Sequence, residues 1–373
     1  MKRREFLQLG TGAVVGGVLV PAALSAHAQG GRGQAPAAAA PSGPVTKLKV
    51  DIYSRHLQWL RTPEEVADAA LEMGYEGVNV TVRTYPGHIN PEKVAQELPP
   101  FVKALRDRGL LVRQITTNIA DVDSPNAEAI IATASSLGIT HFWWGTYRYE
   151  AGKPIFAQLD GFRPRVAKIA AMAEKYKMTA SYHTYSMPNT VGSAMWDLLH
   201  LLREHDPKYV GFHYDTGHEA HHINGLWEVN MKSAGPYISA VAVKDYAPTQ
   251  EAAGARGGGG RAGGGAAGGR AGGAPAAPAA PAVPAAPADP TLTGNNWRTR
   301  TVPLGAGMVN LTQVANVLKE IGFAGPLEIQ AEYPNGGAES AQDKITLPRA
   351  EVLGAMKKDL VTLRRGFSPS GLL

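Results

Sequence analysis

Two patterns of apolar positions alternate along the chain from about residue 47 to its end. Short continuous apolar runs are typical of buried strands, and apolar positions that recur every three or four residues are typical of amphipathic helices. The first pair shows both: "KLKVDIYS" (47–54) predicts a strand and "TPEEVADAALEMG" (62–74) predicts a helix. Thr62 is expected to cap that helix, because Glu65 stands three residues later and Pro63 begins the first turn.

Seven further strand–helix pairs follow in the same order. Strands are predicted at 75–82, 110–118, 140–147, 178–185, 209–215, 238–246 and 325–333, and helices at 91–108, 125–137, 158–176, 193–204, 226–233, 311–321 and 348–365. Alternating units of this kind predict an α/β fold with a parallel sheet, and eight of them favour a closed (β/α)8 TIM barrel over a doubly wound sheet. We therefore predict one barrel domain over residues 46–373.

One segment interrupts this alternation after the seventh predicted strand. Residues 252–288 contain only Ala, Gly, Pro, Arg and Val. A segment of this composition cannot bury enough apolar surface to offset the entropy lost on ordering, so we predict a disordered insertion. The strand–helix pattern resumes after it, which favours an insertion within one loop over a boundary between domains.

The first 28 residues have the pattern of an export signal. Arg3 and Arg4 precede an apolar stretch that is short for a membrane span, and residues 26–28 form a small-x-small cleavage site. This order is typical of a twin-arginine signal peptide. We expect cleavage, a flexible tether over 29–45, no stable membrane anchor afterwards, and a periplasmic protein.

Composition and charge exclude several classes of function. The chain has no cysteine, which excludes disulfides, a thiol nucleophile and a Cys-ligated zinc. Of the formal net charge of +5, the leader carries +3 and the region around the insertion +1, so the predicted barrel carries only +1. Nucleic-acid binding needs basic residues clustered on the folded part, so we expect no nucleic-acid partner.

Candidate chemistry lies at the ends of predicted strands. Side chains two apart share one face of a strand, and on this count His183, Asp215 and Glu332 are the last inward-facing residues of strands five, six and eight. A carboxylate inside an apolar barrel is costly unless it is paired or binds a metal, and barrel enzymes place their chemistry at this end of the strands. Three such residues favour one shared site, although each alone would suit a strand cap or a salt bridge. Oxygen and nitrogen ligands suit Mn²⁺, Zn²⁺, Mg²⁺ or Co²⁺ without choosing among them.

A set of short motifs between about Leu48 and Arg365 resembles a known family. In chain order they are "SRHLQWL" (54–60), "TYPGHINPE" (84–92), "SYHTY" (181–185), "VGFHYDTGH" (210–218), "AVKDY" (242–246), "VPLGAGMVN" (302–310) and "GPLEIQAEYPNGGAES" (325–340). In this order they resemble the sugar phosphate isomerase/epimerase group of the xylose isomerase-like TIM barrels. The resemblance implies a carbohydrate substrate and a divalent metal held by Glu, Asp, His and Glu on strands five to eight.

The implied ligand set is only partly present. Asp215 and Glu332 match the second and fourth ligands, and the position of the first Glu holds His183, which can still ligate. The third position holds Ala242, which cannot, so the implied metal site lacks one of its four ligands. The resemblance also implies that His218 contacts substrate.

Lys244 lies two residues after Ala242, on the same face of the predicted strand. We expect its ammonium to fill the region of the missing ligand and to stabilise negative charge.

For several other residues, the sequence is compatible with both a functional and a structural role. His56 and His88 follow the first two strands, where they would contact sugar hydroxyls or cap the strand ends. Arg148 would bind an anionic substrate group, as would Arg83, or form a surface salt bridge. Trp143 would stack on a sugar ring or pack in the core.

Three features of the same region are expected to be structural. His213 is expected to pack inside the barrel, and His221 and His222 are expected to be solvated loop residues. The segment "PLGAGMV" (303–309) resembles a phosphate-binding loop but lacks its Lys and spacing. We predict a tight loop there.

The resemblance implies proton removal beside a sugar carbonyl, with Glu332 and His183 as acid and base and Lys244 supporting the charge. An exported enzyme meets free sugars more readily than sugar phosphates, which are cytoplasmic. We therefore expect a sugar isomerase or epimerase, with a 3-keto-glycoside lyase and a non-catalytic carbohydrate-binding barrel as alternatives. The sequence leaves the oligomeric state open.

Overall fold

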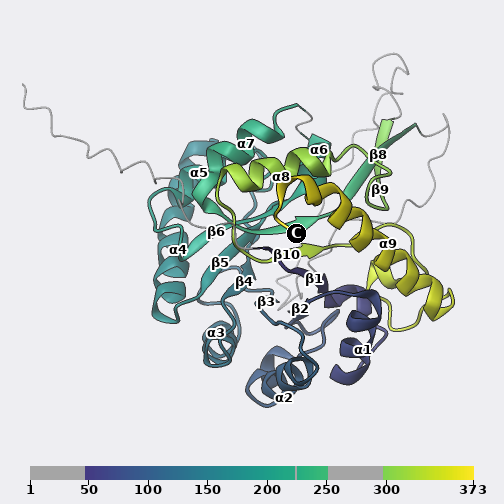
Figure 1. Ribbon diagram of the computed structural model, residues 1–373. Helices are drawn as coiled ribbons and strands as arrows, with labels where there is room; N and C mark the ends of the chain where they lie inside the picture. Colours follow the sequence, from purple (N-terminus) through teal and green to yellow (C-terminus); the bar gives the residue numbers. More distant parts are fainter. Residues whose placement is uncertain (1–46, 223–224, 251–296) are drawn as a thin grey trace, which may run out of the picture. The chain divides into compact units, whose positions relative to one another are not determined.

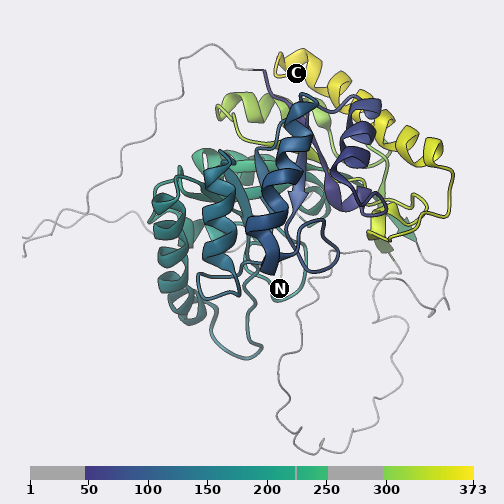
Figure 2. The same cartoon turned by 90° about the horizontal axis from the view of Figure 1, so that it is seen from below.

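A computed structural model describes residues 47–222, 225–250 and 297–373. Eight parallel strands close into a barrel in the order β1-β10-β7-β6-β5-β4-β3-β2, and helices surround them (Figures 1 and 2). This arrangement confirms the predicted (β/α)8 barrel. The predicted leader, tether and insertion lie outside the described residues.

The observed elements follow the predicted alternation closely. The barrel strands are β1 Val50–Tyr53, β2 Gly77–Thr81, β3 Gln114–Thr116, β4 His141–Trp144, β5 Thr179–His183, β6 Val210–Asp215, β7 Ile238–Val243 and β10 Leu327–Ile329. The α-helices are α1 Pro63–Met73, α2 Val94–Asp107, α3 Ala127–Ser136, α4 Ile155–Lys175, α5 Trp196–Leu202, α6 Thr216–His222, α7 Trp227–Ala234, α8 Leu311–Glu320 and α9 Arg349–Phe367. Within these described elements, no helix is both long and apolar enough to cross a membrane.

The strands are buried on both faces, as a barrel covered by helices requires. Every residue of β1, β6 and β7 is buried. Parallel pairing aligns Asp215 with Ala242, and Ala242 with Glu328. The carboxyl ends of β6, β7 and β10 therefore lie side by side.

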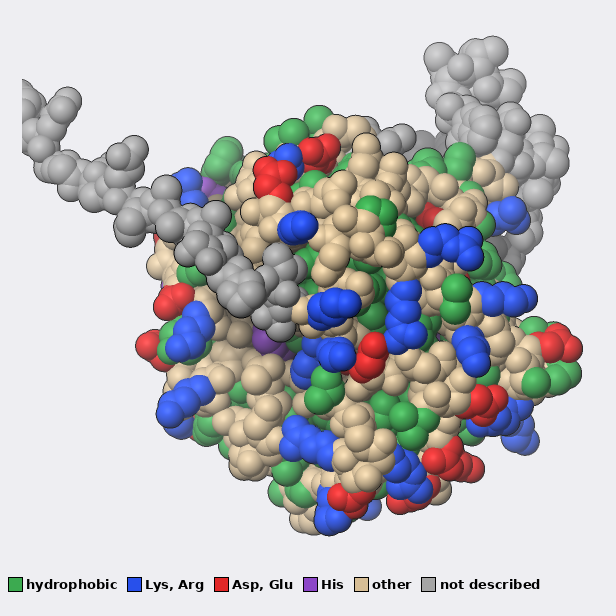
Figure 3. Space-filling view, in the orientation of Figure 1, with side chains coloured by type: hydrophobic (Ala, Val, Ile, Leu, Met, Phe, Trp, Pro, Cys, Tyr) green, Lys and Arg blue, Asp and Glu red, His purple; other side chains and the backbone are tan. Residues whose placement is uncertain are grey.

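The first helix begins and ends as its sequence predicts. Thr62 and Glu65 form a capping box, in which each side chain accepts from the other residue's backbone N–H. Gly74 ends α1 in the left-handed region, with φ of 90°. On the face in Figure 3, positively and negatively charged side chains are scattered among apolar ones.

Two elements differ from the sequence prediction. Residues 216–222 form helix α6, so His221 and His222 belong to a helix and not to a loop. This helix is short and polar and therefore shows no apolar periodicity. In addition, β8 Asp245–Gln250 and β9 Trp297–Val302 form an antiparallel hairpin outside the barrel. Its strands flank the long insertion, and Pro248 in β8 argues against a strand when the sequence is considered alone.

The loop over residues 303–309 folds around the carboxylate of Asp245. Asp245 Oδ2 accepts hydrogen bonds from the N–H groups of Gly305 and Gly307, and Asp245 Oδ1 accepts them from Val309 and Tyr246, all at 2.9–3.0 Å. A Cβ on Gly307 would lie 2.2 Å from Asp245 Oδ1, so only glycine permits this approach. The predicted tight loop is confirmed, and a buried side chain is what holds it.

We expect Asp245→Asn to destabilise the protein by about 2–3 kcal/mol, because an amide NH₂ would then face backbone donors. The melting temperature should fall by roughly 4–10 °C, which differential scanning fluorimetry would measure. Asp68→Asn is the control, since Asp68 is exposed and forms a salt bridge with Arg108 on the surface. Equal melting temperatures for the two variants would contradict the role given to Asp245.

We expect replacement of residues 252–288 by a short Gly-Ser linker to leave the fold intact. The hairpin is already paired up to Gln250 and Trp297, so a short connection can close it. The melting temperature should change by no more than about 3 °C, because closure entropy depends only weakly on loop length. A fall of more than about 10 °C in a thermal scan would mean that the segment stabilises the barrel.

Candidate functional site

The carboxyl ends of β6, β7 and β10 are joined by one buried ammonium group. Lys244 directly follows β7, and its Nζ lies 2.8 Å from Asp215 Oδ2 and 2.9 Å from Glu332 Oε2. Asp215 ends β6, and Glu332 follows β10 by three residues. The structure thus brings together three residues predicted from the sequence.

Two imidazoles face the same carboxylate oxygen. His183 Nε2 lies 3.4 Å from Asp215 Oδ2, and His218 Nε2 lies 3.7 Å from it. All three side chains are buried. They form the group among the described residues whose ligand atoms lie close enough together to hold a metal ion, within 4.8 Å of one another. Glu332, the third ligand expected from the sequence, is not in this group, and His218, expected to contact substrate, is in it instead.

The backbone of α6 fixes the orientation of Asp215. Its Oδ1 accepts the N–H groups of Gly217 and His218, both at 3.0 Å, and its own N–H donates to Thr184 Oγ1. These bonds occupy Oδ1 and leave Oδ2 facing Lys244 and the two histidines. The carboxylate is therefore preorganised before any ligand arrives.

Gly217 is required by the packing around Lys244. A Cβ at this position would lie 2.5 Å from the Tyr246 ring and 2.8 Å from Lys244 Cγ. Any larger residue would displace the lysine stem or the tyrosine. The pattern Asp-Thr-Gly-His (215–218) thus combines a carboxylate, a close approach and an imidazole.

Electrostatics hold Lys244 and Glu332 in their charged forms. Burial lowers the pKa of Lys244, but the charges of Asp215 and Glu332 outweigh it and raise this pKa well above 10.5. Burial raises the pKa of Glu332, but the charges of Lys244 and Arg55 outweigh it and lower this pKa to about 2. At neutral pH the site therefore contains a fixed ammonium and a fixed carboxylate.

His183 is held as a neutral ring inside an aromatic wall. Burial lowers its pKa well below 6.5, and the neighbouring His213 lowers it further. Its ring stacks on Trp143, with centroids 3.9 Å apart, and meets the edge of Tyr185 at 4.6 Å. Arg83 lies over the same Trp143 ring, 5.0 Å from its centroid.

The histidines after the first two strands have different surroundings. His56 is fully buried, with Nδ1 3.3 Å from the Ala338 carbonyl, and its Nε2 has no hydrogen-bond partner among the described residues. Burial lowers the pKa of His56 to about 3, and Glu332 and Lys244 both act on it, so it belongs to the site region. His88 contacts Thr81 Oγ1 and the Leu60 carbonyl through its two ring nitrogens, which favours its structural reading.

Of two further residues, Arg148 is on the surface and His213 lies beside His183, with ring centroids 4.9 Å apart. Arg148 is exposed on the loop after β4, where its backbone pairs with Thr190. His213 is buried inside the barrel, with Nε2 3.3 Å from Glu328 Oε1, as predicted for a core histidine. The side chains of His221 and His222 are outside the described part.

Sequence reasoning missed several residues that support the cluster. Ser186 Oγ lies 2.6 Å from His218 Nδ1 and fixes that ring. Arg55 donates to the Glu339 carbonyl at 2.8 Å and lowers the pKa of Glu332. The alternation that singled out His183 also reaches Tyr185, two residues later, so this signal was present in the sequence.

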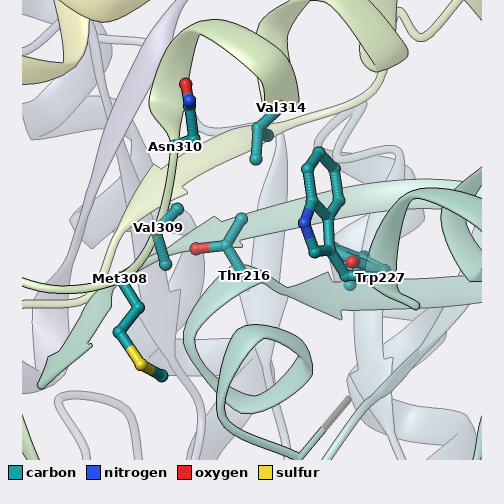
Figure 4. Close-up of a pocket in the computed structure, with 7 residues that line it drawn as sticks. Thr216, Trp227, Met308, Val309, Asn310 and Val314 are labelled. Atoms are coloured by element: carbon teal, nitrogen blue, oxygen red, sulfur yellow. The ribbon is translucent and has the colours of Figure 1, made fainter. Parts of the chain in front are cut away.

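A small cavity on the outer side of the strands does not compete as a functional site. It lies beside Thr216, Trp227 and Met308 and has a volume of about 20 Å³ (Figure 4). That volume suits about one water molecule. The cluster of titratable side chains described above lies instead at the ends of β5, β6, β7 and β10.

The donor set fits a divalent metal. Ligands bonded at about 2.1 Å lie roughly 3–3.5 Å from one another around a metal, and both histidines lie near that distance from Asp215 Oδ2. Two imidazoles and a carboxylate suit several first-row ions. The ammonium of Lys244 contacts the same oxygen, so it would compete with such an ion.

Comparison with known proteins agrees with the fold. The sequence profile of the xylose isomerase-like TIM barrels matches residues 67–351. No protein of curated function matches the sequence.

Solved structures share the barrel at low sequence identity, which establishes a common fold alone. A D-psicose 3-epimerase from Clostridium cellulolyticum H10, solved with D-tagatose, is 10% identical with a TM-score of 0.57, over 86% of this chain and 99% of that chain. A 3-keto-D-glucoside 4-epimerase from E. coli is 11% identical with a TM-score of 0.54, over 86% and 100%.

A third structure, the IolI protein, contains a bound zinc atom. It is 15% identical with a TM-score of 0.56, over 86% of this chain and 100% of that chain. The profile match spans most of the chain described above. The chain belongs to the xylose isomerase-like TIM barrel family.

Proposed function

We propose that this protein is a carbohydrate-active enzyme of the sugar isomerase/epimerase type, which moves a proton at the carbon beside a carbonyl. The observation that carries this proposal is the ammonium of Lys244, held between Asp215 and Glu332 next to two imidazoles. Proton removal beside a carbonyl creates an enediolate, whose negative charge needs a positive centre nearby. The epimerase structures that share the barrel support the same class of reaction.

Lys244 and Glu332 act as a coupled pair in this proposal. In the resting site the ammonium keeps the pKa of Glu332 at about 2, too low for an effective base. When Lys244 turns toward the substrate oxygen, Glu332 loses its partner and its pKa rises. Glu332 therefore becomes more basic as Lys244 moves to stabilise the developing oxyanion.

His183 is the second proton-transfer group. It is neutral, and its Nε2 lies beside Asp215. A neutral imidazole that is not bound to a metal can accept a proton from one face of the substrate or relay it to the other. Its stacking on Trp143 restricts the ring to one orientation.

His183, Asp215 and His218 would hold a divalent metal, which when bound supplies a Lewis acid for the carbonyl. Ser186 fixes the ring of His218 through Nδ1, which leaves Nε2 toward Asp215. We infer an exported, periplasmic enzyme from the twin-arginine pattern, and hence an unphosphorylated sugar or glycoside as substrate. β-Elimination from a 3-keto-glycoside begins with the same proton removal.

We expect Lys244→Met and Glu332→Gln each to lower the rate of proton removal by roughly 10²–10⁴-fold. NMR would follow the exchange of the α-proton of D-fructose and other ketoses into deuterated water, which detects proton removal whatever the product. Lys344→Met is the matched control, because Lys344 is exposed. Unchanged exchange in both site variants would contradict the mechanism, and no exchange in the wild type with any ketose would favour a binding protein.

We expect Lys244→Met to bind Mn²⁺ or Zn²⁺ at least about tenfold more tightly than the wild type, a difference of about 1.4 kcal/mol. The substitution removes a positive charge 2.8 Å from Asp215 Oδ2. Isothermal titration calorimetry would give the dissociation constants, with Asp215→Ala expected to abolish binding and Lys344→Met to leave it unchanged. Equal affinities in Lys244→Met and wild type would show that the ammonium does not compete with the metal.

A further inference from the structure

A groove of about 740 Å³ runs away from the candidate site. It lies between β9, the segment after β10 and helix α9, and Glu332 and Tyr246 form part of its wall. Ligand sites for small molecules typically have volumes of about 300–1,000 Å³. This groove is larger than one monosaccharide ring fills.

Glu332 connects the groove to the chemistry. Its side chain is 14% exposed, whereas those of Lys244 and Asp215 are 2% and 0% exposed. One carboxylate thus contacts the buried ammonium and also lines the groove. Tyr246 forms a second connection, because its ring centroid lies 5.9 Å from that of His218.

The lining of the groove combines aromatic and polar side chains with the charged side chains of Arg300, Glu332 and Glu339. Tyr246 and Tyr333 contribute aromatic side chains, and Thr301, Asn335 and Ser340 contribute polar groups. Sugars present apolar C–H faces and hydroxyl edges, which match aromatic side chains and polar groups respectively.

The groove walls are fixed by hydrogen bonds. Thr301 Oγ1 donates to the Glu332 carbonyl at 2.7 Å, which ties β9 to the site. The Glu339 carboxylate accepts the N–H groups of Asn335 and Gly337, both at 2.9 Å, and Asn335 Nδ2 donates to the Val352 carbonyl. A preformed wall binds its ligand with little ordering cost.

We propose that this groove is a second subsite, which binds a further ring attached to the reacting sugar, so that the substrate is a glycoside or disaccharide. The inference rests on the proposed function, because it assumes that the reacting sugar lies beside Lys244 and Glu332. The attached ring would lie along Tyr246 and extend toward Ser340.

The test compares D-fructose with three disaccharides that carry glucose on D-fructose at different positions: turanose, maltulose and palatinose. Isothermal titration calorimetry would measure their affinities for wild type, Ser340→Trp and Ser340→Ala. Ser340 is exposed, and Lys244 and Asp215 do not line the groove, so the indole would occupy the Ser340 end of the groove and leave the charged cluster in place. Melting temperatures would confirm that both variants fold.

We expect at least one disaccharide to bind the wild type tenfold or more tightly than D-fructose does. Ser340→Trp should abolish this preference and leave the affinity for D-fructose unchanged, and Ser340→Ala should retain the preference. If no disaccharide binds more tightly than D-fructose, or if Ser340→Trp weakens all four sugars equally, the subsite is overturned.

Exchange of the D-fructose α-proton into solvent, measured in the same preparations, separates the two proposals. Exchange without any preference for disaccharides would overturn the subsite alone. The absence of both exchange and binding would overturn the proposed function and the subsite with it.

Discussion

The architecture of the site depends on the cost of burying an ammonium group. A lysine that is 2% exposed must be compensated by carboxylates within contact distance, and Lys244 has one on either side. Asp215 comes from β6 and Glu332 from the segment after β10, so the charge fixes the spacing of three strand ends. The same requirement accounts for Gly217, which leaves room for the lysine stem, and for the α6 backbone, which holds Asp215 in place. The need to neutralise Lys244 thus determines which strand ends meet at the candidate site.

Much of this arrangement was predictable from local patterns. Alternation of strand and helix patterns predicted the barrel, and alternation within strands brought His183, Asp215 and Glu332 to one place, because both signals are periodic and short-range. The hairpin of β8 and β9 was missed, since its strands pair across the long insertion. The contact of Ser186 with His218 was missed for a similar reason, because 32 residues separate them and no periodicity relates them. Local patterns therefore predict elements and strand faces, and long-range contacts decide which side chains meet.

The departure from the family pattern has a physical counterpart. At Ala242 the chain lacks the imidazole that the resemblance implied, and two residues later Lys244 brings a positive charge to the same carboxylates. An ammonium carries a single charge on a flexible stem, whereas a divalent ion carries two charges and demands several ligands. A site of this kind can stabilise an oxyanion by moving a side chain. Such a site retains a metal if the attraction of His183, Asp215 and His218 for the ion exceeds its repulsion by the Lys244 ammonium.

The loop around Asp245 has a consequence for motif-based annotation. Glycine-rich loops bind phosphate by directing backbone N–H groups at an anion, and residues 303–309 do direct theirs at one. That anion belongs to the protein itself, next to Lys244 in sequence. A phosphorylated ligand would have to expel a buried carboxylate from four donors before it could bind there. The loop thus binds a carboxylate of its own chain. Its glycines permit the close approach of Asp245 and do not indicate a binding site for a nucleotide or a sugar phosphate.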